Sequence, residues 1–180
     1  ALFSLGINIH IKELLDVGCG SGHVGRDVAD ALARPGRGAR VLGLDRKVSH
    51  ARLARPGSLA ADAFALPFPA ASVDVVFSTL FVHHIAPEDL GRLLAEWARV
   101  ARRAVLVLDL ARNRLALAVI SVIGPLAFKS RISVLDGKAS VRQAYTRSEM
   151  AELAAKSLPG AVVDGIAPFT WRLLWLRPEA

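Results

Sequence analysis

The sequence predicts an α/β fold in which a mainly parallel sheet is covered by helices on both faces. Two observations lead to this prediction. Short apolar segments alternate with segments of helical periodicity, which is the order that parallel strands and their crossover helices produce. The chain also has 180 residues, of which 53% are hydrophobic. That is enough for one domain over residues 1–180 with a substantial core, and too apolar for a disordered chain.

Four strands and three helices are expected before residue 101. Val24, Val28 and Leu32 recur at helical spacing after a glycine-rich turn, which indicates an amphipathic helix. Pro87 is followed by two acids, and both features favour the first turn of a helix, where proline fits and the dipole attracts negative charge. The expected strands are residues 12–17, 40–45, 58–61 and 72–79, and the expected helices are residues 22–33, 49–55 and the segment from Pro87.

The last third of the chain is less regular. Residues 115–128 form a 14-residue apolar stretch that is too short to cross a bilayer. We therefore expect a cap-like insertion over residues 112–145, with peripheral contact to a membrane surface as an open alternative. Thr146 and Glu149 have the spacing of a capping box, which predicts the start of a helix. Further strands are expected at residues 104–110, 161–166 and 170–176.

Composition and charge exclude several classes of protein. No stretch reaches 18 uncharged apolar residues, so no membrane-spanning helix is predicted. The single cysteine excludes an internal disulfide and a thiolate zinc site, so we predict no metal and a reducing, cytoplasmic location. The net charge is +7, but no run of Lys or Arg exceeds two residues, so no basic arm for DNA is indicated.

The most specific motif is the strand that ends at Asp16 and Val17 and runs into three glycines, Gly18, Gly20 and Gly22. Such a turn allows positive φ and lets a ligand approach the bare backbone, at the N-terminus of the next helix. A dinucleotide fingerprint fits poorly, because its third glycine would fall at His23. The Asp16 carboxylate would also repel a pyrophosphate, whereas it suits a ligand with an ammonium group or hydroxyls.

With Asp16-x-Gly18-x-Gly20-x-Gly22, the sequence resembles the class I S-adenosylmethionine (SAM)-dependent methyltransferases, in particular small-molecule enzymes of the methyltransferase type 11 kind. The resemblance implies a Rossmann-like three-layer αβα sandwich, with a mostly parallel seven-stranded sheet whose last strand is antiparallel. It also implies that the glycine loop wraps the methionine end and ribose of SAM, that Asp45 binds the ribose hydroxyls, and that Asp62 faces the adenine. It runs from Lys12 to Leu110.

SAM is therefore the predicted cofactor. The predicted cofactor-binding residues are Asp16, Gly18, Cys19, Gly20, Gly22, Asp45, Arg46, Asp62, Ala63 and Ser78.

Candidate catalytic residues follow the fourth strand, in residues 78–84, because ligands bind at this edge of an open α/β sheet. Histidine is the natural base near neutral pH, so His83 and His84 are the candidates for taking a proton from the acceptor. Arg142 and Tyr145 precede the capped helix, and in relatives this stretch approaches the acceptor. They are the candidate substrate residues.

The favoured function is methyl transfer to a small, apolar or aromatic acceptor, at oxygen or carbon. An RNA methyltransferase is the weaker alternative, because residues 78–81 read Ser-Thr-Leu-Phe where amino-methylating enzymes carry Asn/Asp-Pro-Pro-Tyr/Phe. A SAM-binding module or truncated remnant without turnover is a third alternative, because we expect the N-terminal lid helix of the family to be short or missing. The sequence leaves the acceptor and the oligomeric state open.

Overall fold

The computed structural model describes residues 11–33, 38–54, 58–122 and 131–178, with the side chains of residues 131–133 left aside. The short N-terminal segment expected in place of a lid helix falls on residues 1–10, outside the described residues. The second part of the 115–128 stretch also lies outside them.

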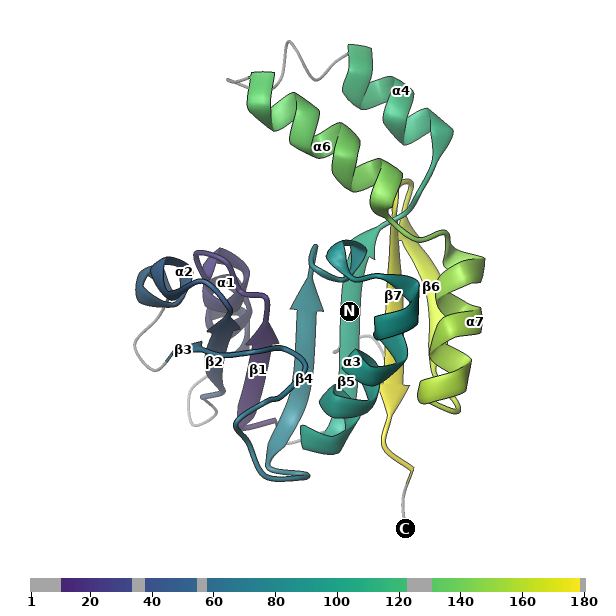
Figure 1. Ribbon diagram of the computed structural model, residues 1–180. Coiled ribbons are helices and arrows are strands. Elements are labelled where there is room, and N and C mark those ends of the chain that lie inside the picture. Colours follow the sequence, from purple (N-terminus) through teal and green to yellow (C-terminus); the bar gives the residue numbers. More distant parts are fainter. Residues whose placement is uncertain (1–10, 34–37, 55–57, 123–130, 179–180) are drawn as a thin grey trace.

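A seven-stranded sheet forms the centre of the fold, in the order β3-β2-β1-β4-β5-β7-β6 (Figure 1). Strands β1 to β5 pair with one another in parallel, and β7 is antiparallel to both β5 and β6. This arrangement confirms the predicted fold, including its antiparallel last strand. The strands are β1 (Glu13–Val17), β2 (Arg40–Asp45), β3 (Leu59–Ala60), β4 (Val73–Thr79), β5 (Ala101–Leu110), β6 (Val162–Ala167) and β7 (Thr170–Leu176).

Helices cover both faces of the sheet. One face carries α3 (Pro87–Val100) and α7 (Arg147–Ser157), whose Trp97 and Met150 are fully buried in the larger core cluster. The other face carries α1 (His23–Leu32), which packs on a smaller apolar cluster. The predicted capping box starts α7: the Thr146 side chain accepts from the Glu149 N–H, and the Glu149 side chain accepts from the Thr146 N–H. A short helix, α2 (Val48–Leu53), follows β2.

A helical hairpin stands beyond the carboxyl ends of the parallel strands (Figure 1). It consists of α4 (Arg114–Val122), within the predicted apolar stretch, and α6 (Arg131–Gln143), which the sequence did not predict. The helices come close at Gly137, where an added Cβ would lie 2.4 Å from Ile120 Cδ1. At the base of the hairpin, the Arg112 guanidinium forms an ion pair with Glu149. The backbone N–H of Arg112 donates to the Tyr145 carbonyl at 3.1 Å. Among the described residues, no helix is both long and apolar enough to span a membrane.

The strand order fixes where a ligand can bind. The chain builds outward from β1 in both directions, since β2 pairs on one side of it and β4 on the other. Ligands of open α/β sheets bind at this switch point, outside the carboxyl ends of the strands. The loops that follow β1, β2, β3 and β4 lie at this edge of the sheet, and the helical hairpin stands beyond the same edge on the side of β5 and β7 (Figure 1).

Candidate functional site

The loop after β1 uses backbone conformations that favour glycine. Gly18, Gly20 and Gly22 have φ of +74°, +53° and +73°. The N–H groups of Gly18 and Cys19 both donate to the Leu44 carbonyl, at 2.8 and 3.1 Å, so the loop is fixed to the end of β2. A Cβ at Gly18 would lie 2.5 Å from the ring of Phe81, whereas one at Gly20 would meet no described atom within 4 Å. Gly20 therefore presents bare backbone to open space.

Asp45 ends β2 and organises the loop beside it. Its carboxylate accepts the Gly20 N–H at 2.9 Å and the Lys47 N–H at 2.8 Å, and His50 Nδ1 lies 3.3 Å away. Partial burial opposes ionisation, but these N–H groups and His50 together hold the pKa of Asp45 below its usual value. The carboxylate is therefore ionised at neutral pH, with lone pairs left for hydroxyl donors.

A cavity of about 300 Å³ lies at this edge of the sheet. Its polar wall comes from the loops after β2 and β3, with Asp45, Arg46 and Asp62. Its apolar wall comes mainly from the segment after β4, which supplies Phe81 and Ile85 beside His84. The full lining is Gly18, Leu44, Asp45, Arg46, Asp62, Ala63, Phe64, Phe81, His84 and Ile85. The cavity thus combines charged hydrogen-bonding groups with an apolar surface, as small-molecule sites do.

The structure brings five of the ten predicted cofactor-binding residues to this cavity: Gly18, Asp45, Arg46, Asp62 and Ala63. Gly20 lies next to it through its bond to Asp45. Ser78 has a structural contact instead, since its buried hydroxyl donates to the Val17 carbonyl at 2.7 Å.

Asp16, Cys19 and Gly22 line a separate small cavity of about 10 Å³, together with Gly25 on α1. It is too small for a cofactor. A carboxylate oxygen of Asp16 lies 3.1 Å from where a Gly25 Cβ would be. The reason is strand alternation: Asp16 shares the α1 face with Leu14, whereas Leu15 and Val17 face α3.

The two candidate bases lie in a 3-10 turn, η2 (Val82–His84). The His84 ring lines the 300 Å³ cavity, while the His83 ring is buried behind it. Their ring centroids are 4.0 Å apart. Burial, and secondly the neighbouring His83 ring, lower the pKa of His84 although Asp109 opposes them, which favours the neutral imidazole that a base requires.

The two predicted substrate residues are separated. Tyr145 is buried, and its hydroxyl donates to the Ile85 carbonyl at 2.6 Å, so it fixes the end of the segment after β4. Burial raises the pKa of this hydroxyl, as do the nearby carboxylates. Arg142 is exposed on α6, and within the described part of the chain it is not among the cavity-lining residues.

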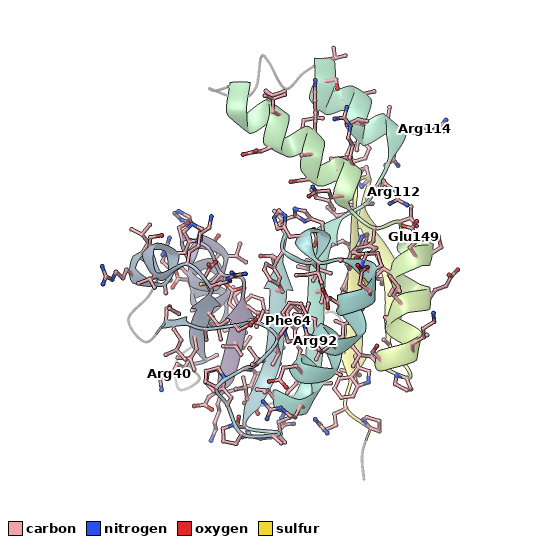
Figure 2. The ribbon with its side chains drawn as sticks, viewed as in Figure 1. Arg40, Phe64, Arg92, Arg112, Arg114 and Glu149 are labelled. Atoms are coloured by element: carbon pink, nitrogen blue, oxygen red, sulfur yellow. The ribbon has the colours of Figure 1, made fainter. Side chains whose placement is uncertain are left out.

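The apolar lining residues Phe64 and Ile85 were not predicted as site residues. Phe64 lies under the guanidinium of Arg92 on α3, whose Cζ is 4.5 Å from the ring centroid (Figure 2). Phe81 stacks on Trp97, with ring centroids 6.3 Å apart. The aromatic residues that follow β3 and β4 were the available signal in the sequence, but the direction of the Phe64 and Phe81 rings depends on Arg92 and Trp97 of α3, which pack against them.

Residues 15–108 match a family model described as a methyltransferase domain. The chain belongs to this methyltransferase family. A malonyl-[acyl-carrier protein] O-methyltransferase of Serratia marcescens is 34% identical over 112 residues, which are 59% of this chain and 41% of the relative. The chain therefore matches less than half the length of that curated relative. The expected class, a SAM-dependent methyltransferase, is confirmed.

Solved methyltransferase structures share the fold over nearly the whole chain. A SAM-dependent methyltransferase from Aquifex aeolicus has a TM-score of 0.68 at 16% identity, covering 97% of this chain and 86% of its own. The magnesium protoporphyrin IX methyltransferase of Synechocystis PCC 6803, with bound SAH, has a TM-score of 0.63 at 19% identity, covering 98% and 79%. The plantazolicin methyltransferase BpumL, also with SAH, has a TM-score of 0.75 at 16% identity, covering 99% and 80%.

The residues at the cavity of this methyltransferase fit SAM, the predicted cofactor. SAM has two ribose hydroxyls that need acceptors, and the ionised Asp45 carboxylate lines the cavity. The methionine end of SAM must also pass close to the protein backbone, and the open space beside Gly20 allows such an approach. The backbone conformation, the charge and the cavity therefore agree.

Asp16 is an unusual group for the interior of this methyltransferase. Its carboxyl is 1% exposed, and neither oxygen has a hydrogen-bond partner among the described residues. Burial, and secondly the charge of Asp45, raises the pKa of Asp16 to about 7. A buried polar group without a partner costs stability. Binding through Asp16 stays a prediction, and its position makes any effect on a ligand indirect, through the glycine loop.

Replacing Asp16 by Asn is expected to change how stability depends on pH. The pKa of Asp16 is about 7 in the folded state against 3.8 for the free side chain, so between these values the folded protein holds a proton that the unfolded chain has lost. The contribution of Asp16 to the free energy of unfolding therefore falls as the pH rises from about 4 to about 7. In urea denaturation, the free energy of unfolding of the variant relative to that of the wild type should rise by about 2 kcal/mol between pH 5 and pH 8.

Asp74→Asn is the matched control for this measurement. Although burial opposes it, the N–H groups of Lys12 and Glu13 and the guanidinium of Arg102 lower the pKa of Asp74. Its contribution to stability is therefore lost below about pH 4, and the gap between this variant and the wild type should be the same at pH 5 and pH 8. A gap for Asp16→Asn that is equally flat would contradict the protonation of Asp16 in the folded state.

Proposed function

We propose that this methyltransferase transfers the methyl group of SAM to a hydroxyl group of a small apolar or aromatic molecule. In this proposal the glycine loop, Asp45 and Asp62 hold the cofactor. The segment after β4 receives the acceptor, and one of its two histidines takes the acceptor proton. Methylation of an activated ring carbon is the nearest variant, because it needs the same removal of a proton.

One observation carries the proposal, namely the division of the 300 Å³ cavity into a polar wall and an apolar wall. Asp45 ends β2 and Asp62 follows β3, while Phe81, His84 and Ile85 follow β4, which is two strands away from β2 in the sheet. The acids suit the ribose and adenine of the cofactor. The aromatic and aliphatic wall then remains for an acceptor, and it would pair poorly with a strongly charged one.

The hairpin beyond the sheet edge supports an apolar acceptor independently. Leu115 on α4 and Leu135 on α6 are 62% and 65% exposed, and Val119 is also exposed. Leu115, Val119 and Val122 recur at helical spacing on α4, so they form one apolar stripe. Apolar side chains gathered on a cap near a ligand site favour a partner with apolar surface.

The protein supplies position and proton removal in this reaction. When bound, SAM supplies an activated methyl group, whose transfer is an in-line displacement. The task of the chain is to orient the acceptor oxygen and to exclude water, for which the rings of Phe64 and Phe81 are suited. A phenol or alcohol also needs a base: the neutral His84 lines the cavity, and the buried His83 lies against its ring.

A second candidate acceptor is a carboxylate of an acyl group on a carrier protein. It is favoured by one observation, the 34% identity to the Serratia marcescens enzyme that carries this function in its name. A carboxylate is already ionised at neutral pH, so its methylation needs no base. Loss of activity on removal of the histidines therefore distinguishes a hydroxyl acceptor from this one.

The test is transfer of labelled methyl from SAM into an extract of the source cells, followed by separation into organic-soluble, nucleic-acid and protein fractions. Label in the organic fraction is the expected result, and it provides material for identification. Label in the protein fraction would favour the carrier-protein acceptor, and label in RNA would overturn both proposals. Absence of label in every fraction, with SAM bound in calorimetry, would favour a binding module without turnover.

A further inference from the structure

A buried acid pairs with one of the two histidines at the acceptor side. Asp109 lies in β5, a strand of otherwise mostly buried apolar residues, and its side chain is buried. Its Oδ1 is 2.7 Å from His83 Nδ1 and accepts the Leu110 N–H at 2.7 Å. Its Oδ2 accepts the His83 N–H at 2.9 Å. Asp109 therefore holds both the backbone and the ring of His83.

The pairing determines which ring nitrogen of His83 carries the proton. A carboxylate oxygen that already accepts one N–H can only accept another, so His83 Nδ1 is the donor. In the neutral ring, Nε2 is then left as a bare acceptor. This Nε2 is buried and has no hydrogen-bond partner within the described residues. A histidine with a purely structural role would be expected to use both nitrogens, because an unpaired buried polar atom is costly.

The position of His83 is fixed from two sides. Asp109 holds the middle of η2 through the two bonds to His83, and the Tyr145 hydroxyl holds the residue after η2 by donating to the Ile85 carbonyl. The ring of His83 touches that of His84, which lines the 300 Å³ cavity. The unpaired Nε2 is therefore on a rigid segment next to the site, as a pre-organised base requires.

We propose that Asp109 is a positioning residue that keeps the proton of His83 on Nδ1, so that His83 Nε2 accepts the proton of the acceptor hydroxyl. This inference rests on the proposed function. The acceptor O–H bond breaks and its proton goes to Nε2. The acceptor oxygen forms the new bond to the methyl carbon while the carbon–sulfur bond breaks and its electron pair stays on sulfur. The positively charged ring is stabilised by Asp109 and later releases its proton to water.

The first arm of the test needs no acceptor. Nitrogen-15 NMR of the full chain distinguishes the two histidine tautomers, and His83→Gln identifies the signal of His83 among the five histidines. The wild type should show the proton on Nδ1. Asp109→Asn should weaken this preference, because the amide keeps only one of the two oxygens that accept from His83 and Leu110. A wild-type His83 with its proton on Nε2 would overturn the inference, whatever the substrate is.

The second arm compares two phenols of similar size at pH 8, namely 4-ethylphenol, which is not ionised, and 4-nitrophenol, which largely is. His83→Gln and Asp109→Asn should lower kcat on 4-ethylphenol by roughly 10²- to 10⁴-fold, the range for general-base catalysis, and on 4-nitrophenol far less. An equal loss on both would indicate a purely structural pair and overturn the inference. If the wild type methylates neither phenol, the proposed function fails, while the NMR arm still decides the position of the proton.

Asp164→Asn is the matched control for both arms. Asp164 lies on β6 and pairs with Arg172, whose Nε is 3.0 Å from it, at the edge of the sheet away from the cavity. The same chemical change there should leave the His83 tautomer and both rates within about twofold of the wild type. SAM affinity measured for each variant shows whether the cofactor site is intact.

Discussion

Replacing Asp45 by Ala is expected to weaken SAM binding by roughly 1–3 kcal/mol, which is about 5- to 150-fold in Kd. The ionised carboxylate lines the cavity and holds the glycine loop through the Gly20 N–H at 2.9 Å. The variant therefore loses hydrogen bonds to ligand hydroxyls and also releases the loop that binds beside them. Titration calorimetry with SAM measures the change directly.

Two further variants test whether a loss of SAM affinity in Asp45→Ala comes from the Asp45 carboxylate itself. Asp45→Asn keeps the size and one oxygen acceptor, so it should bind SAM more tightly than Asp45→Ala and less tightly than the wild type. Asp74→Ala removes an acid that also accepts backbone N–H groups, from Lys12 and Glu13 at 2.8 and 3.2 Å, but at the start of β1. It should lower stability and leave SAM affinity unchanged. An affinity of Asp45→Ala equal to that of the wild type would refute the ribose role of Asp45.

The sheet could be predicted because its signals are local. Each strand is a short apolar segment between turn residues, and the start of α7 is marked by a capping box that the structure contains. The helix α6 was missed because its glycine indicates a break when the sequence is considered alone. In the structure Gly137 is required for contact, since a Cβ there would collide with Ile120 of α4. Contact with a neighbouring helix has overridden the helix propensity of glycine.

A position at the cavity could be predicted for residues that follow parallel strands, as Asp45 and Asp62 do, while their role in binding stays a prediction. Asp16 has the same kind of motif signal, but its side chain points to α1, because neighbouring side chains on a strand face opposite sides of the sheet. The partner of His83 was not predictable. Asp109 is 26 residues away in sequence, and the sequence contains only the weak signal of one acid near the end of an apolar strand.

Replacing Gly20 by Ala is expected to lower SAM affinity more than it lowers the free energy of unfolding. The residue has φ of +53° and its Cβ position has no described atom within 4 Å, so the added methyl group is strained but does not collide. The free energy of unfolding should fall by roughly 1–2 kcal/mol, the cost of the left-handed conformation. SAM affinity should fall more, by roughly 10- to 100-fold, because the methyl group occupies the space through which the ligand approaches the backbone. Denaturation and calorimetry measure the two effects separately.

Gly160→Ala provides the comparison that isolates the ligand effect. Gly160 lies in the turn between α7 and β6, with φ of +84°, and a Cβ there also has no neighbour within 4 Å in the described structure. Both variants therefore place an alanine at positive φ in open surroundings, and they differ in distance from the cavity. Equal stability losses with a loss of SAM affinity confined to Gly20→Ala would assign the effect to the site. If both variants bind SAM as the wild type does, the loop does not contact the cofactor at Gly20.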